Sequence, residues 1–188
     1  MSRIGKKPIA LPDKVKAKLD NRTVLVEGPL GKLSYSLPEG INVEIKDSIL
    51  TVSIAQGASG KSALFGTARA RLNSMVSGVA TAFSKVLEIN GVGFKGAVEG
   101  NRVTLQLGFS HPVIFDIPQG VKMSFDPKQT TLTISGFDKE RVGNIASQIR
   151  RVKRTEPYKG TGIKYQGEHV IRKAGKTAAG AASGGAKK

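Results

Sequence analysis

Residues 57–62 carry the most enzyme-like pattern in the chain, Gly-Ala-Ser-Gly-Lys-Ser. The pattern ends in Gly-Lys-Ser and falls between a predicted strand and a predicted helix, which is the setting of a phosphate-binding loop. However, Ala55 stands where such a loop has its first glycine, and residues 136–138, which precede the second predicted helix, show nothing similar. We therefore interpret the segment as a connector whose Lys61 can contact phosphate, rather than as a nucleotide-hydrolysing site.

Proton transfer and metal chemistry lack suitable groups in this sequence. Only His111 and His169 could act as general bases near neutral pH, and they lie in different segments. No cluster of His, Asp or Glu has the spacing of metal ligands. The chain has no Cys, which excludes thiolate chemistry and disulfides. We therefore expect a protein that is not an enzyme and has neither a cofactor nor a small-molecule substrate.

The segment 150–165 is rich in cations, glycines and tyrosines. Its first part holds the cations Arg150, Arg151, Lys153 and Arg154, near the end of a predicted helix that Pro157 is expected to stop. Gly160 and Gly162 then permit close backbone approach, and Tyr158 and Tyr165 offer stacking faces. Cations contact phosphates and aromatic rings stack on exposed bases, so the segment predicts an RNA surface. The expected contact residues are Lys153, Arg154, Tyr158, Lys159, Gly160, Lys164 and Arg172.

A second glycine-rich stretch, residues 90–96, reads Asn-Gly-Val-Gly-Phe-Lys-Gly. In one interpretation the glycines bring the backbone close to RNA, Lys95 supplies a charge and Phe94 stacks on a base. In the other, the stretch is a tight hairpin and Phe94 packs in the core. The sequence leaves both open, and Lys95 joins the expected RNA-binding residues.

The excess of positive charge is concentrated at the two ends of the chain. The 188 residues include 30 Lys and Arg against 14 Asp and Glu, a formal net charge of +16. Residues 150–188 hold 11 basic and 2 acidic groups, and residues 1–20 hold 6 and 2. The 129 residues between them hold 13 and 10. Such asymmetry favours a polyanionic partner, with nucleic acid first and an anionic membrane surface second, over lysines that serve solubility alone.

The sequence also bears on localisation. No uncharged apolar run approaches the roughly 18 residues that a membrane span needs. The first eight residues, Met-Ser-Arg-Ile-Gly-Lys-Lys-Pro, lack the apolar stretch of a signal peptide. We therefore expect a cytoplasmic protein without a membrane partner.

An internal repeat organises the chain. Residues 37–43, Leu-Pro-Glu-Gly-Ile-Asn-Val, recur as residues 117–123, Ile-Pro-Gln-Gly-Val-Lys-Met. At the same offset, three further residues have counterparts: Leu25 with Leu105, Gly28 with Gly108 and Tyr35 with Phe115. Later matches, with changed loop lengths, are 50–53 with 132–135, Gly66 with Gly143, Ala68 with Ile145 and Leu72 with Ile149. The ordered series indicates two copies of one unit of about 80 residues, each long enough for a small core.

Each copy is predicted to consist of strands followed by one helix. Apolar and polar residues alternate in segments such as 103–107 and 113–117, which is typical of half-buried strands. Helical spacing follows in the stripes Leu64, Ala68, Leu72, Met75, Val79 and Val142, Ile145, Ile149, Val152, with Asp138 as N-cap of the second helix.

This pattern predicts an α+β fold with two tandem similar domains from an internal duplication, each a mainly antiparallel β-sheet packed against one α-helix. The expected domains are 1–82 and 83–173, the second with the main RNA-binding surface. Residues 174–188, a basic tail of mostly Ala, Gly and Lys, are expected to be flexible, because they bury too little apolar surface to offset their ordering entropy.

The chain resembles the bacterial family of large ribosomal subunit protein six. The family signature reads approximately Pro-Glu-Pro-Tyr-Lys-Gly-Lys-Gly-Ile, and seven positions match: Glu156, Pro157, Tyr158, Lys159, Gly160, Gly162 and Ile163. Thr155 replaces the first Pro and Thr161 replaces a Lys, which removes one expected phosphate contact. Residues 1–9 and 90–94 are similar to the same family.

The resemblance implies two α+β domains from a duplication, and binding to 23S rRNA near the sarcin–ricin loop and the stalk base. It also implies neighbouring large-subunit ribosomal proteins, and translational GTPases that act close by. A basic DNA-binding protein of the chromatin type is the alternative, and the aromatic residues beside glycines favour RNA over it.

Overall fold

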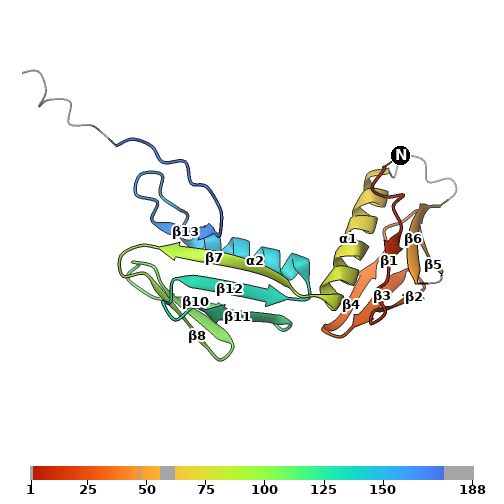
Figure 1. Ribbon diagram of the computed structural model, residues 1–188, viewed down its shortest axis with the longest axis horizontal. Coiled ribbons are helices and arrows are strands. Elements are labelled where there is room, and N and C mark those ends of the chain that lie inside the picture. The colour runs from red at the N-terminus through yellow and green to blue at the C-terminus, as the bar shows by residue number, and fades with distance from the viewer. Residues whose placement is uncertain (1, 47, 56–61, 176–188) are drawn as a thin grey trace, which may run out of the picture.

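The computed structural model describes residues 2–46, 48–55 and 62–175 and shows two copies of one arrangement (Figure 1). The first copy consists of β1 (Ile9–Ala10), β2 (Lys16–Asp20), β3 (Thr23–Gly28), β4 (Gly31–Ser36), β5 (Ile41–Lys46), β6 (Ile49–Ile54) and α1 (Ser62–Ala80). The second consists of β7 (Phe83–Asn90), β8 (Lys95–Glu99), β9 (Arg102–Gln106), β10 (Val113–Asp116), β11 (Val121–Phe125), β12 (Thr131–Gly136), α2 (Lys139–Val152) and β13 (Gly162–Tyr165).

The strand order of the second copy repeats that of the first. The first copy has two three-stranded sheets, in the orders β1-β6-β5 and β2-β3-β4. The second has β7-β12-β11, extended at β7 by β13, and β8-β9-β10. All these ladders are antiparallel, and each helix packs on the strands of its own copy. The predicted α+β fold with two similar units is confirmed.

The turns predicted at the two Pro-x-Gly motifs have the same geometry. The N–H of Ile41 donates to the carbonyl of Pro38, and the N–H of Val121 to that of Pro118, each at 3.3 Å. The glycine inside each turn has a positive φ, 79° in the first copy and 85° in the second, where only glycine is free of strain. Identical turns at matched positions account for the strongest part of the sequence repeat.

One part of the predicted repeat is out of register by a residue. The sequence comparison equated Leu25 with Leu105, but Leu105 is fully buried on β9 whereas Leu25 is half-buried on β3. The buried pair on β3 is Val24 and Val26, which corresponds to Val103 and Leu105. Successive strand residues face opposite sides, so a shift of one residue exchanges the buried and solvent faces. Val26 is therefore the counterpart of Leu105.

Each copy has its own hydrophobic cluster. In α1 the buried residues are Phe65, Ala68, Leu72, Met75, Val76 and Val79. The predicted stripe had Leu64 in this role, but its side chain is 42% exposed, because Phe65 lies two helical turns before Leu72 on the buried face. In α2 the buried residues are Val142, Ala146 and Ile149.

The ends of α2 follow from local hydrogen bonds. The Asp138 side chain accepts from the N–H groups of Glu140, at 2.9 Å, and Arg141, so the predicted N-cap is confirmed. The helix ends at Val152, earlier than the predicted stop at Pro157. It ends there because the Lys153 carbonyl accepts a bond from the N–H of Ile163, at 2.8 Å. This bond turns the chain toward β13.

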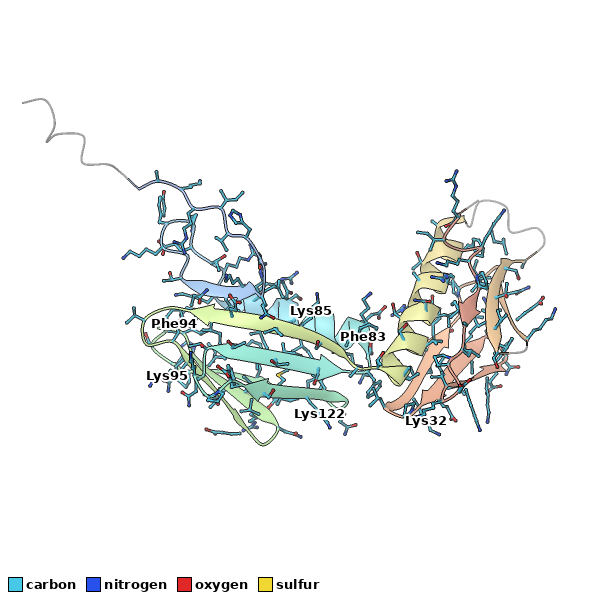
Figure 2. The ribbon with its side chains drawn as sticks, viewed as in Figure 1. Lys32, Phe83, Lys85, Phe94, Lys95 and Lys122 are labelled. Atoms are coloured by element: carbon cyan, nitrogen blue, oxygen red, sulfur yellow. The ribbon has the colours of Figure 1, made fainter. Side chains whose placement is uncertain are left out.

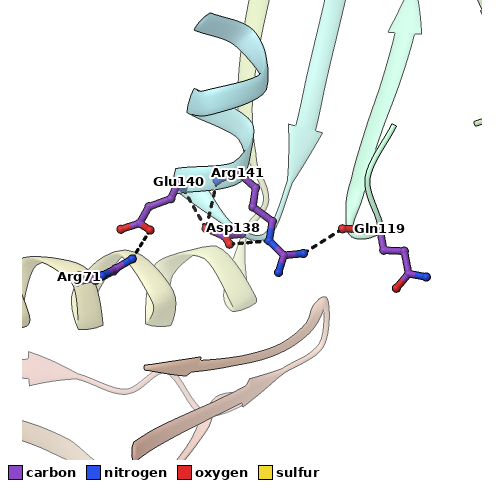
Figure 3. A network of polar contacts seen from close by, with 5 residues as sticks. All are labelled: Arg71, Gln119, Asp138, Glu140 and Arg141. Carbon is purple, nitrogen blue, oxygen red and sulfur yellow. Dashed lines mark hydrogen bonds and ion pairs between the residues drawn. The ribbon is translucent and has the colours of Figure 1, made fainter. Parts of the chain in front are cut away.

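The two copies meet where the N-terminus of α2 approaches the side of α1 (Figure 3). Arg71 of α1 forms an ion pair with Glu140 of α2, which raises the pKa of Arg71. Arg141 contacts Asp138 at 3.3 Å and donates to the carbonyl of Gln119 at 3.4 Å. The Arg71–Glu140 ion pair links the two copies, whereas the Arg141 contacts join the start of α2 to another loop of the second copy.

Phe137 is the apolar part of this junction. A Cβ at Gly31 or at Gly120 would lie 3.3 Å or 2.7 Å from the Phe137 ring. A Cβ at Gly78 of α1 would lie 2.0 Å from the Phe137 carbonyl oxygen. Gly78 therefore permits the close approach of the two copies, and Gly120 leaves room for the Phe137 ring within the second copy. Phe83, at the start of β7, lies at the same junction (Figure 2), with the Lys139 ammonium 5.6 Å from its ring centroid.

Candidate nucleic-acid interface

The segment after α2 forms a loop closed by its own hydrogen bonds. The N–H of Glu156 donates to the Thr161 carbonyl at 2.8 Å, and the N–H of Gly160 donates to the Glu156 carbonyl at 3.0 Å. The Thr161 hydroxyl donates to the Glu156 carboxylate at 3.1 Å. Tyr158 and Lys159 therefore project from a defined turn. Thr161, where the family signature has Lys, stabilises that turn.

Two glycines are required by the geometry of this loop. Gly162 has φ +135°, and a Cβ on it would lie 2.6 Å from the Arg154 carbonyl oxygen. Gly160 has φ +73°, and a Cβ there would lie 3.1 Å from a guanidinium nitrogen of Arg172. A side chain at either position would strain the backbone and displace a neighbour.

Residues 166–173 run back alongside the loop. The N–H of Lys173 donates to the carbonyl of Pro157 at 2.9 Å. The Glu168 carboxylate accepts from Arg150, with Nε at 3.1 Å, and from the N–H of Tyr165 at 3.0 Å. The Arg150 hydrogen bond is the largest influence on Glu168 and lowers its pKa, and the Tyr165 N–H acts in the same direction. This anchored segment, residues 166–173, is called the strap below.

An open hollow of about 540 Å³ lies between the loop and the strap. It is lined by Asn90, Gly160, Lys164, Glu168, His169, Val170, Ile171 and Arg172. Three of the predicted RNA-binding residues, Gly160, Lys164 and Arg172, thus meet in one place. His169 joins them there.

Most cations of the segment 150–173 have no acidic partner among the described residues: Arg151, Lys153, Arg154, Lys159, Arg172 and Lys173. Two cations are paired within the protein, Arg150 with Glu168 and Lys164 with Glu88, the latter at 2.9 Å. Tyr158 is 54% exposed. Cations that the described part of the chain leaves unpaired, together with an exposed ring, suit a surface that meets phosphate and base.

The other predicted positions are placed less directly. The Arg154 backbone bridges to Ile163, which fixes the start of the loop. Lys95 lies exposed on β8, beside Phe94 at the end of the second copy away from the junction (Figure 2). Lys95 lines a separate hollow with residues of β9. The structure therefore does not join Lys95 to the hollow beside the strap.

The aromatic rings of Phe94 and Tyr165 pack mainly against other parts of the protein. Phe94 is half-buried against the second hydrophobic cluster, and a Cβ at Gly91 would lie 2.5 Å from its ring. This supports the hairpin interpretation of residues 90–96 over stacking on RNA. Tyr165 also packs on that cluster, and Arg150 and Lys85 lie 5.5 and 5.8 Å from its ring centroid.

Phe109 and His111 are surface residues that the sequence analysis did not select as RNA contacts. Both are exposed, and their rings lie nearly parallel, 6.4 Å apart between centroids. The Lys153 ammonium lies 4.5 Å from the Phe109 centroid and 5.9 Å from that of Phe94. A signal in the sequence could have pointed to them. The connection 107–112 is longer than the corresponding connection of the first copy, residues 29–30.

Among the described residues, no group of three or more His, Asp or Glu side chains could hold a metal ion. None of the described helices is both long and apolar enough to cross a membrane. Residues 57–61 of the segment 57–62, and residues 176–188 of the predicted tail, lie outside the described residues.

Curated relatives that match nearly the whole chain are ribosomal proteins. The chain is 47% identical over 176 residues to "Large ribosomal subunit protein uL6" of a Picosynechococcus species, an alignment that covers 94% of this chain and 98% of the relative. Proteins of the same name from Thermodesulfovibrio yellowstonii and Afipia carboxidovorans are 46% and 42% identical, each over 94% of this chain. They cover 98% and 99% of those relatives.

The family model described as Ribosomal protein L6 matches residues 11–82 and 90–166, one segment in each copy. The chain therefore belongs to the ribosomal protein L6 family. The resemblance inferred from the loop signature is confirmed.

Proposed function

We propose that this protein is a structural constituent of the large ribosomal subunit, where it binds and stabilises 23S rRNA in support of translation. The observation that carries the proposal is the loop 154–162. Its own hydrogen bonds hold it in one shape, and it presents Tyr158 and Lys159 to the outside. Because the chain belongs to the ribosomal protein L6 family, we take rRNA as the partner of this surface. The site of action is then the ribosome in the cytoplasm.

The mechanism is charge neutralisation combined with shape. Cations without an acidic partner among the described residues can displace the counterions of RNA phosphates, and this displacement drives association and makes it depend on salt. Gly160 is buried beside the Arg172 guanidinium and helps to shape the loop, and the exposed Tyr158 offers a ring to an unpaired base. Such a surface holds an RNA helix in position and needs no reaction of its own.

The contacts proposed for this role are Lys153, Arg154, Tyr158, Lys159, Gly160, Lys164, Arg172 and Lys95. Their expected contributions differ. Lys159 and Arg172 have no acidic partner among the described residues, whereas Lys164 already pairs with Glu88. Lys95 lies on a separate hairpin and would contact a different part of the RNA.

We also propose a division of labour along the chain. Residues 1–82 form one structural unit and residues 83–173 a second unit with the main rRNA-binding surface, followed by the basic tail 174–188. Each unit has its own hydrophobic cluster, which supports the division. The finer placement, near the sarcin–ricin loop and the stalk base, rests on the family resemblance. So do the neighbouring large-subunit proteins and translational GTPases as partners.

Competition between nucleic acids tests the proposal against a chromatin-type DNA-binding function. A 23S rRNA fragment that contains the sarcin–ricin loop and a DNA duplex of equal length would compete for the full chain at fixed salt. We expect the rRNA fragment to displace the duplex at a much lower concentration. Preference for the duplex would contradict the proposal and support the DNA-binding alternative.

A further inference from the structure

The loop between β9 and β10, residues 107–112, lies beside the proposed rRNA surface. Its connection is Lys153, whose ammonium lies 4.5 Å from the ring centroid of Phe109. The carbonyl of Lys153 accepts the hydrogen bond from Ile163 that closes the base of the loop 154–162. Lys153 therefore contacts Phe109 through its side chain and the base of the loop 154–162 through its backbone.

The first copy shows that the fold does not require such a loop. There β3 and β4 are joined by Pro29 and Leu30 alone. That turn packs on the end of α1: the N–H of Leu30 donates to the Val79 carbonyl at 3.3 Å, and a Cβ at Gly28 would lie 2.8 Å from the same oxygen. In the second copy the same position, beside the end of the helix, carries a longer loop with two aromatic rings.

Phe109 contributes little to the core. It is 42% exposed and is not among the residues packed on the second hydrophobic cluster, whereas Phe94, on the other side of Lys153, is. The ring contacts Lys153 and His111 and leaves part of its surface accessible to a partner. The nearly parallel ring of His111, inclined by 22°, gives Phe109 a fixed plane.

We infer that Phe109, His111 and Lys153 form a stacking platform for an unpaired RNA base, with Lys153 close to an adjacent phosphate. This inference deepens the proposed function and rests on it. Flat aromatic faces bind bases of any sequence by stacking, and a neighbouring cation adds attraction to the backbone. The platform extends the rRNA surface from the loop 154–162 to the loop 107–112.

A set of substitutions at Phe109 tests the platform in the full chain, with the 23S rRNA fragment as ligand. We expect Phe109→Ala to weaken binding about 5- to 100-fold, as for the loss of one base stack, and to leave the salt dependence unchanged because no phosphate contact is lost. Phe109→Leu, which keeps an apolar side chain but removes the ring, should weaken binding similarly. Leu19→Ala is the matched control, since Leu19 is 45% exposed on β2 of the first copy.

A fluorescent variant reports the contact directly. The chain contains no Trp, so Phe109→Trp introduces a single indole. We expect this variant to bind at least as tightly as the wild type and its emission to be quenched when RNA binds, because the base stacks on the indole. Thermal unfolding of each variant checks that the fold is intact.

The outcomes separate the platform from the proposed function. Failure of the wild type to bind the fragment would overturn the proposed function. Binding by the wild type with equal affinity for Phe109→Ala, or with an unquenched Phe109→Trp, would overturn the platform alone. Normal RNA affinity of Phe109→Ala combined with poor incorporation into large subunits would assign the rings to a protein neighbour and also overturn the platform.

Discussion

The two copies share a fold but differ at the end of the helix. After α1, only residues 81 and 82 separate the helix from the next strand. After α2, the chain forms the loop 154–162, adds β13 to the edge of β7 and continues as the strap. The last turn of α2 contains Arg150 and Arg151, whereas that of α1 contains no basic residue.

This difference teaches where the binding surface was added. The parts that both copies retain, the strand order and the helix on the sheet, are those that bury apolar side chains. The segments found only in the second copy are the longer loop 107–112, the loop 154–162, β13 and the strap. They carry the exposed rings of Tyr158 and Phe109, and most of the cations of the segment 150–173 that have no acidic partner among the described residues. The first copy is thus an internal reference for what the fold needs without RNA.

Alanine substitutions at matched core residues should have the largest effects on the stability of the two copies. Leu72 of α1 and Ile149 of α2 are both fully buried, and replacement by Ala should destabilise either copy by about 2–5 kcal/mol. If the copies are separate structural units, Leu72→Ala will lower hydrogen-exchange protection in residues 2–80 and leave RNA affinity nearly unchanged. Ile149→Ala should lower protection around α2 and weaken RNA binding. Equal loss of protection in both copies for either variant would show one cooperative unit.

Gly162→Ala should disrupt the added loop alone. The strain at φ +135° and the approach to the Arg154 carbonyl predict a loss of stability of about 1–3 kcal/mol. We expect RNA affinity to fall at least about tenfold, because a displaced loop loses several charge-assisted contacts. Gly175→Ala is the control, since a Cβ there meets nothing within 4 Å. Wild-type affinity for Gly162→Ala would mean that RNA binds elsewhere.

The strap should respond to pH through Glu168. Its pKa is lowered in the folded protein, so its contribution to stability is present above the ordinary Glu value of 4.5 and is lost as the pH falls through the lowered value. Glu168→Gln removes the ion pair with Arg150, and we expect it to lower the unfolding free energy by about 1 kcal/mol at pH 7. Denaturant titrations of both proteins should converge as the pH falls below 4.5. A constant difference at all pH values would exclude the ion pair as its cause.

Much of the fold could be predicted from residue patterns. The repeated Pro-x-Gly turns and the alternation of apolar residues indicated the strands, and Asp138 marked the start of α2. The errors have physical reasons. The pairing of Leu25 with Leu105 was wrong because a one-residue shift preserves the alternation but exchanges the faces. Leu64 was chosen over Phe65 because both residues are large and apolar, and only packing distinguishes them.

The site was predicted less completely. The loop 154–162 was evident because its cations, glycines and tyrosines lie close together in sequence. The pairing of Lys164 with Glu88, and the place of Arg172 beside Gly160, depend on contacts between distant segments. Phe109 was missed because its relation to Lys153 exists only in the folded chain.

The salt dependence of RNA binding tests most directly whether the second copy carries the main rRNA surface. The slope of log affinity against log salt would be measured for the wild type, for Lys159→Ala and for Lys14→Ala, an exposed lysine of the first copy. We predict that Lys159→Ala weakens binding and reduces the slope by about one unit, as for one lost phosphate contact, while Lys14→Ala changes neither. An unchanged slope for Lys159→Ala together with a reduced slope for Lys14→Ala would place the main surface on the first copy and contradict this account.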